Sequence, residues 1–449
     1  MPLWKPWDHA IDLKDTFKPK KGHIIPLSPA EQEEVTAFLD DQLKKGYIHH
    51  SKSPQTSPVF FVPKKDRTKW MVQDYRYLNE HTVKNNYPLP LISQLVDKLQ
   101  GAKLFTKMDL RWGYNNVCIK ENDEWKAAFT CFCGSFKPLI MYFGLCNSPA
   151  TFQAMMNKIF TNMDDVVVVY INDLMIFTKT ENQAEHDKIV LEVLRRLEEN
   201  DLFMKPEKCT FHATEVDFLG MIVGHDGIKM DQEKVKATLE WPELKMVKGV
   251  RSFLRLANFY RRFIKDYMKV ARPLHDLMKK ENPFCWEEPQ QVVFDTLKLH
   301  FTMAPILAFP DIDCVFRLES DASDYATRAV LSIEKKGVWH SITSFSHSMT
   351  PQEQNYPITD KEMLSVIQAL EQWHHYLEGT RHQFEIWNDH ANLQWFMQRQ
   401  DLNRQQACWA QYLSRYNVVW CYKLGPSMGV MRVSPTVMER EQRVLQSRT

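Results

Sequence analysis

The sequence has little of what marks a membrane, secreted or disulfide-stabilised protein. No apolar run approaches the ~18–20 residues of a membrane helix, and the first residues lack the basic-then-apolar pattern of a signal peptide. The nine cysteines include no Cys-x-x-Cys pair, and their odd number argues against a complete disulfide set, so we expect reduced thiols. We therefore expect an intracellular chain with no membrane partner, in either the cytoplasm or the nucleus.

The sequence also lacks the extremes of composition that prevent a chain from forming a core. It has 449 residues, of which 44% are hydrophobic and 25% charged, with 57 Lys and Arg against 56 Asp and Glu. This balance excludes disordered and collagen-like chains, and at roughly 100–200 residues per domain the length predicts two to four domains.

The near-neutral net charge hides one strongly basic segment. The window from Lys245 to Lys280 holds eleven Lys and Arg but only two acidic residues. Apolar residues recur within it at helical spacing, which leaves Arg251, Arg255 and Arg262 largely off the apolar stripe. The apolar positions are Val250, Phe253, Leu254, Ala257, Tyr260 and Ile264. The basic face is either an ordinary solvated helix face or a surface that contacts phosphates.

Local patterns predict alternating helices and strands, and hence an α+β or α/β architecture. A helix is expected after Ser28, which forms a capping box with Glu31, and Gly46 is expected to end it. Apolar and β-branched runs predict strands, and amphipathic stretches predict further helices. The expected strands are 58–62, 104–108, 166–170, 174–177, 314–318, 329–334, 338–341 and 384–387, and the expected helices are 148–160, 185–200 and 361–377.

Acidic residues stand where some of these elements end. Asp109 follows the expected strand 104–108, and Asn172 and Asp173 occupy the tip of an expected hairpin. Short carboxylates held rigidly at such places suit paired Mg²⁺ ions ~3.5–4 Å apart in phosphoryl transfer. The alternative is that Asn and Asp stand at a tight turn on backbone grounds alone.

Short motifs follow one another in a fixed order through nearly the whole chain. They include Gln73-Asp-Tyr-Arg-Tyr-Leu-Asn79, Phe105-Thr-Lys-Met-Asp109, Phe143-Gly-Leu-Cys-Asn-Ser-Pro-Ala-Thr-Phe-Gln153, Tyr170-Ile-Asn-Asp173, Glu319-Ser-Asp321, Asp360-Lys-Glu362 and Trp387-Asn-Asp389-His390. In this order they resemble the reverse transcriptase of gypsy-type LTR retrotransposons with its ribonuclease H attached. The resemblance implies RNA-directed DNA synthesis and cleavage of RNA in RNA/DNA hybrids.

The resemblance also implies a fold and a set of partners. The fold is α+β, with a right-hand polymerase of fingers, palm and thumb followed by a ribonuclease H-like mixed α/β domain. The expected partners are an RNA template, a DNA primer, RNA/DNA hybrid and deoxynucleoside triphosphates, and the expected cofactor is Mg²⁺, with Mn²⁺ as an alternative. The expected segments are an N-terminal extension at 1–30, fingers and palm at 31–225, a basic helical thumb and connection at 226–303, the ribonuclease H-like domain at 304–432 and a divergent tail at 433–449.

By resemblance, five acidic residues have catalytic and metal-binding roles. Asp109 and Asp173 match the acids that bind metal for DNA synthesis. Asp321, Glu362 and Asp389 match three of the four carboxylates that ribonuclease H places around two metal ions. Taken alone, Glu362 is equally well explained as a first-turn helix acid favoured by the helix dipole.

Further positions match residues that contact the substrates. Lys64 and Lys65 match a loop that meets the triphosphate, although the arginine expected at the position of Trp70 is missing. Tyr114 matches the residue that excludes a 2′-hydroxyl, with a core tyrosine as the alternative. The remaining expected substrate-binding residues are Gly144 and Gln153 beside the template and incoming base, together with Arg76, Arg251 and Arg262.

Five residues depart from the family's pattern where its fold or chemistry is sensitive: Trp70, Arg255 and the three that follow. Asn172 replaces an acid of the Tyr-x-Asp-Asp motif, Arg328 replaces a glycine, and Arg432 stands where the fourth ribonuclease H acid is expected. Whether Asp164 or Asp165 compensates for Asn172 is left open. Each ~1.4 kcal/mol of lost transition-state stabilisation is a tenfold loss of rate.

Two further hypotheses follow: an impaired relic that only binds nucleic acid, and an expressed fragment without a biochemical role.

Overall fold

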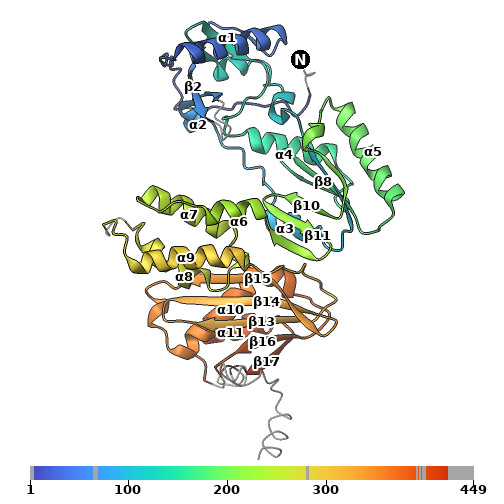
Figure 1. Cartoon of the computed structure of the whole chain (residues 1–449), viewed down its shortest axis with the longest axis vertical. Coiled ribbons are helices and arrows are strands. Elements are labelled where there is room, and N and C mark those ends of the chain that lie inside the picture. The colour runs from blue at the N-terminus through green and yellow to red at the C-terminus, as the bar shows by residue number, and fades with distance from the viewer. Residues whose placement is uncertain are drawn as a thin grey trace, which may run out of the picture. The chain divides into compact units, whose positions relative to one another are not determined.

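The computed structural model describes residues 5–63, 69–279, 283–390, 393, 396 and 401–422. The chain folds into two compact units, residues 1–219 and 220–449, each built from helices and sheets (Figure 1). The domain limits expected from the sequence remain predictions. Among the described residues, no helix has the length and apolar character needed to cross a membrane. All nine cysteines are free thiols.

The first unit begins with the helix that the sequence predicts. Helix α1 (Pro29–Lys44) is capped by Ser28, whose side chain and that of Glu31 form the expected capping box, and Gly46 follows the helix with a φ of 68°. The other elements of the unit are β1 (Ile48–His50), β2 (Ser57–Pro63), β3 (Lys69–Gln73), α2 (Arg76–His81), α3 (Ile92–Asp97), β4 (Leu104–Asp109), the 3-10 helices η1 (Gly113–Asn116) and η2 (Glu124–Ala127), β5 (Phe129–Cys131), β6 (Gly134–Pro138), α4 (Ser148–Ile159), β7 (Val167–Tyr170), β8 (Asp173–Thr178), α5 (Gln183–Glu199), η3 (Pro206–Lys208), β9 (Thr210–Ala213) and β10 (Glu215–Phe218).

Two sheets organise this unit. One has the strand order β1-β6-β5-β2-β3, and the other has the order β7-β8-β4-β9. Helices α4 and α5 pack on the second sheet, and its strand β8 buries Leu174, Met175 and Ile176. The helices cover the face of the sheet on which this apolar run would otherwise be exposed to water. The expected strands and the hairpin formed by β7 and β8 are confirmed.

The second unit carries one large sheet with the strand order β15-β14-β13-β16-β17. Its strands β13 and β16 run parallel, and α10 packs across β13, β14 and β16. The elements of the unit are β11 (Met221–Gly224), β12 (Gly227–Met230), α6 (Gln232–Leu239), α7 (Val247–Phe259), η4 (Arg261–Phe263), α8 (Tyr267–Asp276), α9 (Glu288–Thr302), β13 (Phe316–Ala322), β14 (Ala326–Lys335), β15 (Val338–Ser348), η5 (Glu353–Asn355), α10 (Ile358–Leu377), β16 (Phe384–Asn388), α11 (Arg404–Leu413) and β17 (Val418–Tyr422).

The expected hairpin of the second unit is confirmed, but β14 and β15 are longer than the strands predicted at 329–334 and 338–341, and a third strand is displaced from its prediction. Strands β14 and β15 turn at Lys336 and Gly337, which both have a positive φ. The strand expected at 314–318 instead spans Phe316–Ala322. It continues because alternate residues face a buried and a half-buried side, and because β14 pairs with it along its whole length. Asp321 therefore lies within the strand rather than after it.

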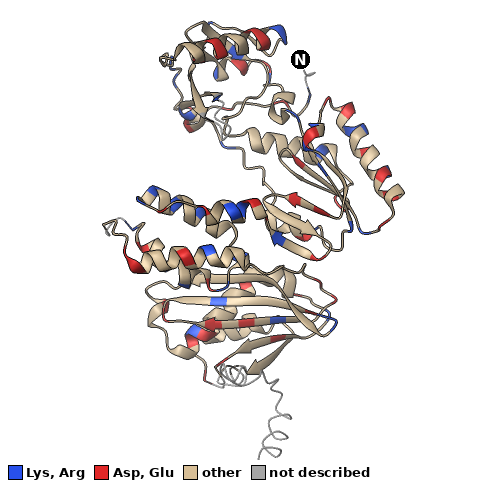
Figure 2. Cartoon of the chain, in the orientation of Figure 1, with Lys and Arg blue, Asp and Glu red and all other residues tan. Residues whose placement is uncertain are grey.

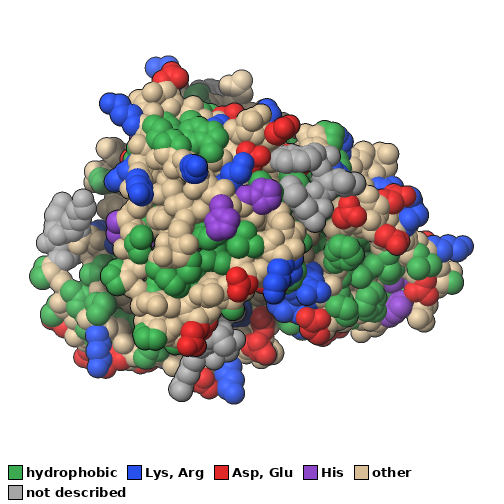
Figure 3. Space-filling view, turned by 90° about the horizontal axis from the view of Figure 1, so that it is seen from above, with side chains coloured by type: hydrophobic (Ala, Val, Ile, Leu, Met, Phe, Trp, Pro, Cys, Tyr) green, Lys and Arg blue, Asp and Glu red, His purple; other side chains and the backbone are tan. Residues whose placement is uncertain are grey.

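The basic segment forms helices interrupted by a short 3-10 turn. In α7 the expected apolar positions Val250, Phe253 and Leu254 are buried, whereas Arg251 and Arg255 are exposed. Figure 2 shows Lys and Arg along this helix. The helix ends before Tyr260, so the last two positions of the expected stripe, Tyr260 and Ile264, lie outside α7 and flank η4. On the face shown in Figure 3, basic and acidic side chains are interspersed, in keeping with the nearly neutral net charge.

Candidate active sites

The first acidic centre consists of Asp109 and Asp173. Asp109 is the last residue of β4 and Asp173 the first residue of β8, and they are direct partners in the antiparallel ladder. Directly opposite residues of such a pair project from the same face of the sheet, so the register places both carboxylates side by side. Only Ile171 and Asn172 separate the paired residues Tyr170 and Asp173, which makes the connection a two-residue turn.

This turn is strained and is held by a buried amide. Ile171 has a φ of 53°, a left-handed conformation that a β-branched residue adopts only at a cost of roughly 1–3 kcal/mol. Its N–H donates to Oε1 of Gln153 at 2.8 Å, and Nε2 of Gln153 donates to the carbonyl of Val169 at 3.2 Å and to Asn157 at 2.9 Å. Gln153 is completely buried. This side chain, expected beside the template, therefore positions the turn.

Asn172 lines a cleft of about 810 Å³ together with Lys205 and Lys208. Its Oδ1 atom is buried and has no hydrogen-bond partner among the described residues. A Cβ atom added to Gly113 would lie 2.2 Å from that oxygen, so the glycine leaves the space that Asn172 occupies.

The two acids considered as compensation for Asn172 lie elsewhere. Asp164 and Asp165 line a separate depression beside Lys98 and are not among the residues that line the cleft of Asn172. Asp217, on β10, instead lies near Asp173 and forms an ion pair with Lys107. Nothing in the sequence marks Asp217 as a site residue beyond its exposed place in the alternating strand β10.

Lysines surround the carboxylates of the first acidic centre. Nζ of Lys205 lies 3.9 Å from Asp109 Oδ1, and Nζ of Lys208 lies 3.6 Å from Asp109 Oδ2, because η3 presents both lysines to one side chain. Burial raises the pKa of Asp173, and Lys107 opposes that shift. The two adjacent carboxylates are ligands suited to a divalent cation, but with one negative charge fewer than three carboxylates would give.

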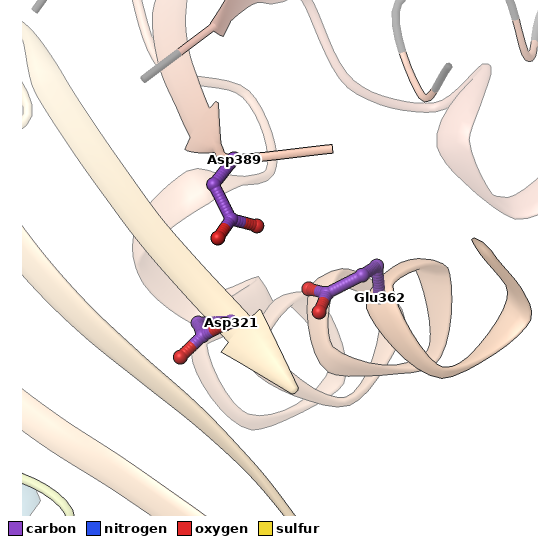
Figure 4. Close-up of side chains that lie close together, drawn as sticks. All are labelled: Asp321, Glu362 and Asp389. Atoms are coloured by element: carbon purple, nitrogen blue, oxygen red, sulfur yellow. The ribbon is translucent and has the colours of Figure 1, made fainter. Parts of the chain in front are cut away.

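The second acidic centre brings together Asp321, Glu362 and Asp389 (Figure 4). Asp321 stands near the end of β13, Glu362 in the first turns of α10, and Asp389 just after β16. Parallel strands end at the same edge of a sheet, and the pairing of Arg317 with Glu385 sets a register that, continued along the strands, brings 321 opposite 389. Each side chain offers an oxygen within 4.8 Å of the others. Such oxygens are the ligands that Mg²⁺ prefers, so this set fits a divalent cation.

Glu362 is buried and is held by two donors. Its carboxylate accepts hydrogen bonds from the backbone N–H of Ala322 and from Nδ2 of Asn388 at 2.9 Å. Burial raises its pKa to about 7, and the carboxylates of Asp321 and Asp389 act in the same direction. Asn388 was not predicted as a site residue, although it stands next to Asp389 in the motif.

Two family models match separate parts of the chain. Residues 62–223 match the family described as reverse transcriptase (RNA-dependent DNA polymerase), and residues 311–416 match the RNase H-like domain found in reverse transcriptase. The first acidic centre lies in the first match, and the second lies in the second. The chain combines a reverse transcriptase domain with an RNase H-like domain. We refer to the two acidic centres as the polymerase centre and the nuclease centre.

Similar proteins agree with this conclusion. The chain is 36% identical over 404 residues, 89% of its length, to the transposon Tf2-3 and Tf2-7 polyproteins of Schizosaccharomyces pombe (strain 972 / ATCC 24843), and it spans 30% of their length. The resemblance to gypsy-type LTR retrotransposons is thereby confirmed.

Solved structures share the fold. The foamy viral protease-reverse transcriptase in complex with dsDNA matches with a TM-score of 0.79 and 22% identity, over 95% of this chain and 92% of that chain. The same viral protein in complex with RNA/DNA hybrid matches with a TM-score of 0.75 and 22% identity, over 96% of this chain and 60% of that chain. The expected combination of a polymerase fold and a ribonuclease H-like fold is confirmed.

The reverse transcriptase domain places other expected residues at different distances from the cleft. Tyr114 is buried against Phe143 and Phe152, with ring centroids 4.8 and 5.5 Å away, and burial raises its pKa. Phe143 lines the cleft, so Tyr114 lies just beneath the cleft wall. Gly144 has a φ of 98°, and its carbonyl accepts a hydrogen bond from Asn79.

Arg76 does not line this cleft. Its guanidinium forms two hydrogen bonds with Asp74, at 2.8 and 2.7 Å, and Arg76 lines a different depression. Lys64, Lys65 and Arg432 lie outside the described residues, as does the side chain of Trp70. Arg251 is exposed on α7, and Arg262 is half-buried with an Nε atom that lacks a partner among the described residues.

An aromatic residue that the sequence did not single out also lines the polymerase cleft. Trp112 has a φ of 49° and is 44% exposed. Lys45 Nζ lies 4.9 Å and Arg111 Cζ 4.5 Å from the centroid of its ring. An exposed ring flanked by cations is suited to stacking with nucleic-acid bases.

Proposed function

We propose that the chain synthesises DNA on RNA or DNA templates at the polymerase centre and cleaves the RNA strand of RNA/DNA hybrids at the nuclease centre. The supporting observation is that each acidic centre stands on the sheet of a domain matching the corresponding family. Mg²⁺ is the proposed cofactor, held by Asp109 and Asp173 in one centre and by Asp321, Glu362 and Asp389 in the other. It would lower the pKa of the attacking hydroxyl or water and stabilise charge on the phosphate.

At the polymerase centre, the chain's own residues would position the reactants. Asp109 and Asp173 present adjacent carboxylates as direct partners in the ladder, and Gln153 keeps the turn before Asp173 in its strained conformation. Lys205 and Lys208 lie beside Asp109, so their positive charges would also face the phosphates of an incoming triphosphate. Tyr114 would limit the space at the sugar of the incoming deoxynucleotide.

At the nuclease centre, the three carboxylates converge from a strand, a helix and a strand end, so they would hold an attacking water against one phosphate of the RNA strand. Foamy viral reverse transcriptase has been solved in complex with an RNA/DNA hybrid and with dsDNA. These complexes of a protein with the same fold support nucleic-acid duplexes as the partners.

Primer extension and hybrid cleavage test this function. We expect the full chain to extend an oligo-T primer on poly-A with Mg²⁺ or Mn²⁺ and to cut the RNA of a labelled hybrid. Asp109→Asn should abolish only extension, and Glu362→Gln should abolish only cleavage. If the folded chain binds no primer–template, the proposal is wrong.

A second candidate is a protein that binds duplexes without catalysis. The neutral side chain of Asn172 and the positive charge of Arg328 favour it, because each weakens the negative field that a divalent cation needs. It predicts salt-sensitive binding with little base preference, together with extension and cleavage no faster than in the Asp109→Asn and Glu362→Gln variants.

A further inference from the structure

Arg328 faces the nuclease centre from the neighbouring strand. It is the direct partner of Asp321 in the antiparallel ladder between β13 and β14, so both side chains project from the same face of the sheet. The guanidinium donates through Nε and Nη2 to the same oxygen, Asp321 Oδ2. A glycine, which the family usually has at this position, would leave that carboxylate oxygen free.

A second acid fixes the guanidinium from the other side. Asp266 precedes α8 and accepts a hydrogen bond from Nη1 of Arg328 through Oδ2. Asp266, Asp321 and Arg328 line one pocket of about 210 Å³, which also includes Asp389. Two of the guanidinium's three nitrogens therefore bind one acid and the third binds the other, so Arg328 has little freedom to leave Asp321.

The paired oxygen matters because of the distances that two metal ions require. Two divalent ions ~3.5–4 Å apart can be bridged by one carboxylate only if each of its oxygens is available to one ion. In this centre one oxygen of Asp321 is already bound to a fixed positive charge. The guanidinium of Arg328 therefore places a fixed positive charge on the side of Asp321 where a second divalent ion would have to bind, and like charges at that distance repel.

We propose that Arg328 is a resident cation of the nuclease centre and that the three carboxylates accordingly hold one divalent ion rather than two. Glu362, Asp389 and the other oxygen of Asp321 would hold that ion, and the guanidinium occupies the side of Asp321 where a second ion would bind. The inference rests on the proposed metal-dependent nuclease function, and it makes hybrid cleavage by this chain a one-metal reaction.

Counting bound Mn²⁺ ions by electron paramagnetic resonance tests the inference without using activity. The parent is the full chain with Asp109→Asn, so that the polymerase centre contributes little. We expect one Mn²⁺ that is lost with Glu362→Gln. Arg328→Met should bind a second ion, whereas Arg328→Lys, which keeps the charge, should still bind one. If Arg328→Met does not fold, Arg328→Gly takes its place.

The control is Arg415→Met, which removes an exposed arginine paired with Glu378 and should leave the count at one. Finding two ions in the parent would overturn the role of Arg328. Finding the same number of ions in the parent and in Arg328→Met and Arg328→Gly would also overturn it, and either result would leave the metal site itself intact. If no ion in the parent or in any variant is sensitive to Glu362→Gln, the proposed nuclease function itself fails, and the inference fails with it.

Discussion

At the polymerase centre the neutral Asn172 stands where the family resemblance implies a carboxylate, whereas at the nuclease centre the three matched carboxylates are present and Arg328 stands beside them where the resemblance implies a glycine. Both changes make the site less negative by one formal charge. Neither disturbs packing: Asn172 fits beside Gly113, and Arg328 is paired with two acids. The comparison teaches that packing and strand pairing can accommodate a change of charge at either centre without a change of fold.

In each centre a buried side-chain amide holds the local geometry. Gln153 holds the turn at Ile171, and Asn388 donates a hydrogen bond to Glu362. Each amide binds protein groups through both its oxygen and its nitrogen. Because the buried amides are satisfied, the acids that they position stay in place without a bound ion.

Restoring the missing carboxylate should produce the largest effect. Asn172→Asp returns a negative charge beside Asp109 and Asp173, and we expect primer extension at saturating Mg²⁺ to become about a thousandfold faster, which is about 4 kcal/mol of transition-state stabilisation. Single-turnover extension measures the change. Hybrid cleavage by the same variant should not change, because the nuclease centre is untouched.

A matched control adds the same charge to the same cleft. Asn115 also lines the cleft but is not at the hairpin tip, so Asn115→Asp should not accelerate extension. An equal gain in both variants would mean that general cleft charge, rather than the position of residue 172, limits the polymerase centre.

The two domains should respond to acid in opposite directions when metal is removed with EDTA. Burial lowers the pKa of His9 from 6.5 to about 4. As the pH falls, the unfolded state therefore binds a proton before the folded state does, so the reverse transcriptase domain loses about 3 kcal/mol of its free energy of unfolding between pH 6.5 and pH 4. The pKa of Glu362 is raised from 4.5 to about 7, so the ionised, buried carboxylate destabilises the RNase H-like domain above pH 7. This destabilisation disappears as the pH falls to 4.5, because Glu362 becomes protonated.

Hydrogen exchange at pH 5 and pH 7.5 can follow the two domains separately. His9→Gln should flatten the response of the first domain alone, and Glu362→Gln that of the second. A parallel loss of protection in both domains at pH 5 would show that other groups dominate the linkage.

Much of this arrangement could be read from the sequence because it depends on local patterns. The capping box at Ser28, the hairpin ahead of Asp173 and the buried stripe of α7 follow from short-range spacing. The partners of these residues could not be predicted, because they come from distant segments. Nothing near Arg328 in the sequence indicates Asp266, and nothing near Ile171 indicates that the amide of Gln153 binds its N–H.

Removing one buried amide should impair the activity of its own centre and leave the activity of the other centre unchanged. Gln153→Leu leaves the Ile171 N–H unpaired, and we expect a loss of about 2 kcal/mol in the stability of the reverse transcriptase domain, with slower extension but unchanged hybrid cleavage. Asn388→Leu should have the converse effect. Urea unfolding combined with the two activity assays measures both. If either variant lowered both activities equally, the two amides would not be specific to their own centres.

The smallest effect is expected on duplex binding through α7, which lies outside both centres. Arg251 and Arg255 are exposed on this helix, and removing one arginine–phosphate interaction should lower the slope of log K against log salt by about 0.9. The Arg251→Ala, Arg255→Ala double variant should therefore bind a primer–template duplex a few-fold more weakly at 0.15 M salt, with a shallower salt dependence, while Arg415→Ala should match the unmodified chain. An unchanged slope would make this basic face an ordinary solvated surface. The lysines of the polymerase cleft would then be the better candidates for binding phosphate.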